Sequence, residues 1–129
     1  MKPRGVLYFL PAILYMGLIF YLSSRPAPPL AREWPTWWGI KSIHVVEYAV
    51  LAGLLWCGFA RGTVARPWVI ALASVAVTFL WGISDEIHQA FVPERTALAM
   101  DAVSDLVGGL AGIALCAVLG ALRRRSGRD

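Results

Sequence analysis

The chain has 129 residues, enough for one small domain, but 58% of them are hydrophobic, only 16% are charged, and the net charge is +4. A mean hydropathy of +0.63 would leave a soluble domain of this size with too little polar surface, so the composition favours an integral membrane protein. Nucleic-acid binding is not expected, because the basic residues flank apolar runs instead of alternating with polar and aromatic contacts.

Four apolar stretches are long enough to cross a bilayer. About 17 to 25 mostly apolar residues are needed, since a helix rises about 1.5 Å per residue and the hydrocarbon core is about 30 Å thick. In chain order, the predicted helices span residues 5–23, 41–60, 67–91 and 102–122. The sequence therefore predicts an all-α integral membrane protein, a bundle of four transmembrane helices with short loops, in which residues 1–122 form a single domain.

The basic residues are unevenly distributed between the two sides of such a bundle. One side would carry Lys2, Arg4, Arg61, Arg66, Arg123, Arg124, Arg125 and Arg128, and the other Arg25, Arg32, Lys41 and Arg95. Lys and Arg concentrate in cytoplasmic loops. Both termini are therefore predicted to be cytoplasmic, with residues 123–129 as a basic tail near anionic lipid.

Small residues recur every four positions on the fourth predicted helix, at Gly108, Gly112, Cys116 and Gly120. This spacing makes one flat stripe that lets another helix approach closely. The partner could be a helix of the same chain or a second copy, so a homo-oligomer formed through Gly108, Gly112 and Gly120 is one of two open interpretations.

Ionisable and polar residues gather at the ends of the helices opposite the termini. They are Lys41, His44, Glu47, Asp85, Glu86, His88, Gln89, Arg95, Asp101 and Asp105. Ionisable groups in or near hydrocarbon cost about a few kcal/mol each, so they persist only when they are paired, solvated in a cavity or used. We therefore expect either a functional cavity or a polar network at this end.

Helical periodicity indicates which of these side chains share a face. At 100° per residue, Lys41, His44 and Tyr48 form one stripe, with Glu47 beside it.

On the third predicted helix, Asp85, His88 and Gln89 share a face and Glu86 is expected to be turned aside. Asp101 and Asp105 lie one turn apart at the start of the fourth helix, where a helix N-terminus favours acid. Three helices would thus contribute to one polar ring.

Two kinds of chemistry fit this ring, and the sequence names no cofactor. His44 with Glu47, and Asp85 with His88, are carboxylate and imidazole pairs three residues apart, which can bind metal in helix bundles. Metal is the less favoured interpretation, because no cysteine-based or HExxH signature accompanies the pairs. Alternatively, Lys41 and Arg95 hold a phosphate while His44, oriented by Glu47 or Asp85, moves a proton.

The candidate site residues divide accordingly into two groups. The candidate catalytic residues are His44, Glu47, Asp85, Glu86 and His88. The candidate ligand-binding or phosphate-binding residues are Lys41, Tyr48, Gln89, Arg95, Asp101 and Asp105.

Purely structural roles are the alternative for several of these residues. Asp101, with Ser104 three residues later, could be a helix N-cap. Asp85 could pair with Arg95, and Glu47 with Lys41, as interhelical salt bridges that only hold the bundle together.

The motifs resemble those of the VanZ-like membrane proteins over nearly the whole chain. The matching residues are Ser23-Ser24, Lys41-x-x-His44-x-x-x-Tyr48, and Asp85-Glu86-x-His88-Gln89-x-Phe91-x-Pro93-x-Arg95 followed by Asp101 and Gly108. The third block is the most specific. This chain has Glu94 where the family commonly has glycine, and Asp105 where it commonly has asparagine, so both departures add negative charge near the site.

The resemblance implies a multi-pass protein of the bacterial inner membrane with its motif residues on the extracytoplasmic side. It also implies a link to the cell envelope and to resistance against the glycopeptide teicoplanin. Its ligand would be an anionic lipid-linked molecule, such as a wall precursor or a polyprenyl phosphate, which the protein binds or modifies. A metal-dependent membrane hydrolase and a non-enzymatic scaffold or accessory subunit are the alternatives.

Overall fold

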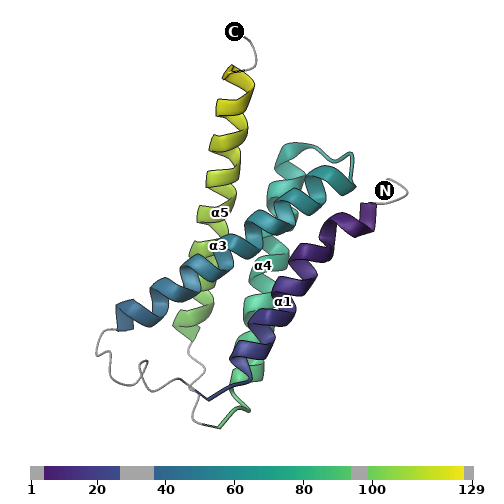
Figure 1. The fold of residues 1–129 in the computed structure, drawn as a ribbon. Helices are drawn as coiled ribbons and strands as arrows, with labels where there is room; N and C mark the ends of the chain where they lie inside the picture. Colours follow the sequence, from purple (N-terminus) through teal and green to yellow (C-terminus); the bar gives the residue numbers. More distant parts are fainter. Residues whose placement is uncertain (1–4, 27–36, 94–98, 127–129) are drawn as a thin grey trace.

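The computed structural model describes residues 5–26, 37–93 and 99–126, with side chains for 5–26, 43–93 and 100–126. No strand occurs in these residues. A short 3-10 helix, η1 (Gly5–Phe9), leads directly into α1 (Leu10–Ser23), and the three longer helices follow (Figure 1). Their bounds are Trp37–Gly62 for α3, Pro67–Gln89 for α4 and Ala99–Ser126 for α5.

Four of these segments are long and apolar enough to cross a membrane, at Gly5–Ser23, Ile43–Gly62, Pro67–Gln89 and Met100–Ser126. The predicted all-α fold with four transmembrane helices is thereby confirmed. The third helix ends at Gln89 instead of residue 91, because the amide groups of Phe91 and Val92 bond in turns ahead of Pro93. The fourth continues to Ser126, so part of the predicted basic tail is helical.

Contacts between distant residues show that successive membrane helices run in opposite directions. The end of α1 meets the end of α4 through Ser23 and Asp85. The start of α3 meets the start of α5 through His44 and Asp105, and a carboxylate near the end of α4 lies beside both, so the two pairs of helices run in opposite directions. We call this end of the bundle, marked by these four residues, the polar end; it lies at the bottom of Figure 1.

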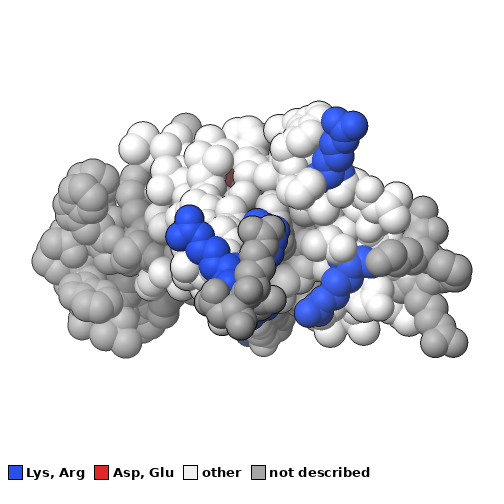
Figure 2. All heavy atoms as spheres, turned by 90° about the horizontal axis from the view of Figure 1, so that it is seen from above, with Lys and Arg blue, Asp and Glu red and all other residues white. Residues whose placement is uncertain are grey.

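The opposite end brings together the start of η1, the end of α3, the start of α4 and the end of α5, and we call it the basic end. Its described basic residues are Arg61, Arg66, Arg123, Arg124 and Arg125. Figure 2 views the molecule from this side and shows Lys and Arg side chains with almost no acidic surface. The charge asymmetry that predicts orientation is therefore also an asymmetry of the folded bundle.

Helices α3 and α5 approach each other closely through glycine. A Cβ atom added at Gly108 would collide with the backbone oxygen of Val45, and one at Gly112 with that of Ala49. Gly120, in contrast, has no described atom within 4 Å of the position of a Cβ. Cys116 also faces α3, since its Sγ lies 3.8 Å from the position of a Cβ at Gly53. Three of the four residues of the small-residue stripe thus serve a contact within the chain, and association with a second copy stays a prediction that would involve Gly120.

The buried apolar core is small and lies between α1 and α3. It consists of Ala12 and Ile19 on α1 packed against Tyr48, Leu51 and Leu55 on α3. Many large apolar side chains face outward instead, while serine, threonine and carboxylate side chains are buried. This inverted distribution is expected where hydrocarbon surrounds the helices, because lipid solvates apolar groups but not polar ones.

Candidate functional site

The polar end contains two clusters of polar side chains, one on each side of α4. The first lies between α3, α4 and α5 and consists of His44, Glu86 and Asp105. Nδ1 of His44 forms a hydrogen bond of 3.0 Å with Oδ1 of Asp105, whose side chain is only 1% exposed. One ligand atom from each of the three residues lies within 4.8 Å of the other two.

The backbone of α4 closes over this cluster at Gly82. A Cβ atom there would lie 2.8 Å from Oδ2 of Asp105 and 3.2 Å from Cε1 of Tyr48. The Tyr48 ring is parallel to the His44 ring, at 4° and 6.4 Å between centroids, and is fully buried. Because glycine occupies position 82, the phenol and the carboxylate can both reach the middle of the cluster.

The second cluster joins α1 to α4. Oδ2 of Asp85 accepts hydrogen bonds of 2.7 Å from Oγ of Ser23 and from Nε2 of Gln89. Ser24 Oγ and His88 Nε2 lie 3.0 Å apart in a hydrogen bond, and the His88 ring packs at 4.3 Å from the Phe20 ring. Asp85, Gln89 and Ser23 are buried, so this network ties the end of the first membrane span to that of the third.

Glu86 is turned aside from the face of Asp85, His88 and Gln89, as helical spacing predicts, but the side to which it turns also carries a polar cluster. Its side chain is buried and faces His44 and Asp105, about 100° away from Asp85 around the helix. The physical reason is that α4 packs against α1 on one side and against α3 and α5 on another, so two of its faces are buried and both carry polar groups.

The two candidate metal-binding pairs do not come together in the folded chain. Asp85 and His88 point toward the serines of α1, whereas His44 bonds across to α5. Among the side chains that the structure describes, the three potential metal ligands that converge are His44, Glu86 and Asp105. Of the four residues that sequence spacing suggested, this group contains only His44.

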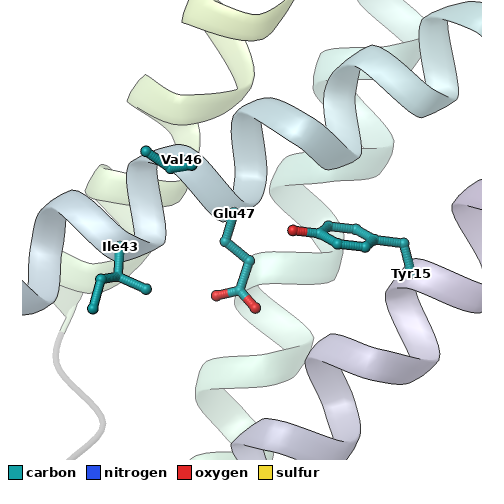
Figure 3. Close-up of a pocket in the computed structure, with 4 residues that line it drawn as sticks. All are labelled: Tyr15, Ile43, Val46 and Glu47. Carbon is teal, nitrogen blue, oxygen red and sulfur yellow. The ribbon is translucent and has the colours of Figure 1, made fainter.

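Glu47 lies apart from both clusters, in a broad groove of about 430 Å³ between α1 and α3. Tyr15, Ile43 and Val46 line the rest of this groove. Figure 3 shows the Tyr15 hydroxyl pointing toward the Glu47 carboxylate from the neighbouring helix. Ile43 and Val46 are exposed on the outer surface, so the groove is accessible from the side of the bundle that faces lipid.

The N-cap interpretation of Asp101 is not supported, because α5 begins at Ala99 and Asp101 is a buried residue of its first turn. Ser104 Oγ donates instead to the backbone oxygen of Met100. Lys41 belongs to α3, one turn before His44, but its side chain lies outside the described residues, as does all of Arg95.

Several residues of the site were not singled out from helical spacing. Ser23 belongs only to the short serine pair of the family motif, yet it bonds directly to Asp85. Tyr15 and Gly82 carried no signal at all, because a tyrosine or a glycine within an apolar span is ordinary there. A pair of serines closing an apolar span was the one local sign that polar contacts begin at that level of the membrane.

Comparison with known proteins gives one match. The family model described as VanZ/LLP1 matches residues 6–120, which includes every residue of both clusters and of the groove. No curated protein and no solved structure matches the chain.

Proposed function

The chain belongs to the VanZ/LLP1 family of membrane proteins, and we propose that it binds, at its polar end, the head group of an anionic lipid-linked molecule of the bacterial cell envelope. The observation that supports this most directly is the position of the groove. It opens sideways between α1 and α3, and Glu47 within it lies three residues after His44 on α3, about one helical turn away. An amphiphile could therefore place its chain in the groove and its head at the clusters.

The apolar part of the groove suits a hydrocarbon chain. Ile43 and Val46 are more than half exposed, and the Tyr15 ring forms the opposite wall on α1. Apolar chains gain little by leaving lipid for such a surface, so affinity would come from the head group and the groove would only set its position. This division of roles fits ligands that share a head group but differ in chain length.

The pairing of His44 with Asp105 suits proton transfer at that head group. A carboxylate that accepts a hydrogen bond from one imidazole nitrogen fixes the orientation of the ring and leaves the other nitrogen to exchange a proton. Modification of the head group is thus part of the proposal. Lys41 and Arg95, as the candidate phosphate ligands, would offset the carboxylates that surround it.

Filling the groove should reduce lipid binding. We expect Ile43→Trp to lower photo-crosslinking of a polyprenyl phosphate analogue in phospholipid vesicles by about tenfold, a loss equivalent to about 1.4 kcal/mol, because the indole would occupy the path of the chain. The matched control is Leu80→Trp, on α4 and equally exposed at 63% against 60% for Ile43. Equal labelling of the Ile43→Trp and Leu80→Trp variants would argue against the groove. If an uncharged polyprenol analogue labelled the unsubstituted protein as strongly as the phosphate analogue, this would argue against recognition of an anionic head group.

We also propose that the protein lies in the bacterial inner membrane with the basic end, and so both termini, in the cytoplasm. Two exposed connections test this orientation, with Val64 at the basic end and Phe91 at the polar end, 90% and 82% exposed. In a variant lacking Cys57 and Cys116, a membrane-impermeant maleimide applied to intact spheroplasts should label Phe91→Cys at least tenfold more than Val64→Cys. The reverse pattern would place the site in the cytoplasm.

A non-enzymatic accessory role is the second candidate, and the network of Ser23, Asp85 and Gln89 favours it. These side chains are buried and bond to one another, which is what a purely structural tie between α1 and α4 requires. Resistance to teicoplanin follows only from the family relationship and would be a consequence of binding a wall precursor. Lipid binding that survives every substitution at the polar end would favour the accessory role.

A further inference from the structure

We propose that His44, Glu86 and Asp105 bind one divalent transition-metal cation, of the Zn²⁺ or Mn²⁺ class, between α3, α4 and α5. This site differs from the metal-binding pairs that sequence spacing suggests, and it does not depend on the identity of any lipid ligand. Each of the three helices supplies one ligand.

The separation of the His44 and Asp105 donor atoms matches the size of such a cation, and Glu86 has to move in by less than about 1 Å to join them. The three ligand atoms all lie within 4.8 Å of one another, and Nδ1 of His44 is 3.0 Å from Oδ1 of Asp105. Two ligands at right angles, each with a bond of about 2.1 Å, are about 3 Å apart. A cation could therefore take the place of the proton shared by His44 and Asp105 with little movement of either side chain.

Unsatisfied groups in the same place point independently to a missing ligand. Oδ2 of Asp105 is buried and has no hydrogen-bond partner among the described residues, and the same is true of the Tyr48 hydroxyl. Both approach Gly82, where an added Cβ would lie 2.8 Å from Oδ2. The bond to His44 satisfies only Oδ1, so a hydrogen-bonded pair alone leaves the second carboxylate oxygen unexplained.

The ligand types indicate which metal. One imidazole and two carboxylates form a nitrogen and oxygen set, which Zn²⁺ and Mn²⁺ accept, whereas Mg²⁺ and Ca²⁺ prefer oxygen alone. A cation would also offset the charge of two buried carboxylates. It would leave room at the metal for a water molecule or for an anionic head group, as metal sites with three protein ligands do.

The test is titration of the purified full chain in detergent, first stripped of metal, with ZnCl₂ by calorimetry and with MnCl₂ by electron paramagnetic resonance. A variant without Cys57 and Cys116 serves as the reference, so that thiolates do not bind zinc. We expect one equivalent of metal to bind. His44→Ala, Glu86→Gln and Asp105→Asn should each weaken binding by at least about tenfold.

His88→Ala tests the alternative that His88, and not His44, is the imidazole ligand of the metal. His88 is the other histidine of the polar end and contacts Ser24 and Phe20. A loss as large as that of His44→Ala would overturn the proposed ligand set. The site itself would be overturned if the reference protein bound no metal. It would also be overturned if Glu86→Gln and Asp105→Asn bound metal as tightly as the reference protein.

Melting curves recorded with and without metal separate loss of binding from misfolding. The reference protein should melt at a higher temperature with saturating ZnCl₂, because only the folded bundle assembles the three ligands. A variant that melts cooperatively without metal, but gains nothing from it, has lost the site and kept the fold. If the protein binds metal but no lipid, the metal site stands and only the proposed function is contradicted.

Discussion

Asp105→Ala is expected to destabilise the protein more than any other substitution at the polar end, by about 3 kcal/mol. Asp105 is almost fully buried and bonds across to His44. Its removal would leave His44 without its acceptor and would open a cavity beneath the backbone of α4 at Gly82. The measurement is the melting temperature of the purified protein in detergent, in the presence of a chelator.

A double-mutant cycle with His44→Ala separates the pair from the rest of the cluster. If the hydrogen bond accounts for the loss, the double variant should be no less stable than Asp105→Ala alone, within about 0.5 kcal/mol. Ser104→Ala is the matched control, because Ser104 is also buried on α5 but its side-chain hydrogen bond goes to its own helix. Additive losses in the cycle would mean that Asp105 acts through other neighbours.

Gly112→Ala should have the second-largest effect, a loss of about 2 kcal/mol or more. The new methyl group would collide with the backbone oxygen of Ala49, which cannot move without displacing α3. Helices α3 and α5 would have to separate around Ala49, about one turn from His44. The contact between His44 and Asp105 should therefore weaken as well. Melting temperature measures the first effect, and metal titration measures the second.

Gly120→Ala provides the contrast on the same helix. Its methyl group would meet no described atom within 4 Å. Alanine is about 1 kcal/mol better than glycine in a helix interior, so this variant should be neutral or slightly stabilised. Similar losses at both positions would indicate that α5 packs along its whole length, as it would if a second copy covered the region around Gly120.

Much of the architecture could be predicted because it depends on local properties. The lengths of the apolar runs, the prolines between them and the asymmetry of the basic residues each act within one helix or one loop. The membrane spans were therefore predicted to within a few residues of Gly5–Ser23, Ile43–Gly62 and Pro67–Gln89. The concentration of polar groups at one end followed from the same counting.

The partners of those polar groups could not be predicted in the same way. Periodicity gave the angle between Asp85 and Glu86 around α4, but it could not show that both faces are covered. His44 and Asp105 are 61 residues apart, and Ser23 and Asp85 are 62 apart. Which residues pair across such a sequence separation depends on how whole helices pack, and local sequence patterns do not contain this information.

Hydrophobicity and charge act on each segment separately, so they already settle in the unfolded chain which segments cross the membrane and which ends carry the ionisable groups. The assignment of Glu86 to the cluster with His44, and of Asp85 to the serines of α1, required the packed bundle. It depends on the close approach allowed by Gly82, Gly108 and Gly112, and on the direction in which each helix face is turned once its neighbours are in place.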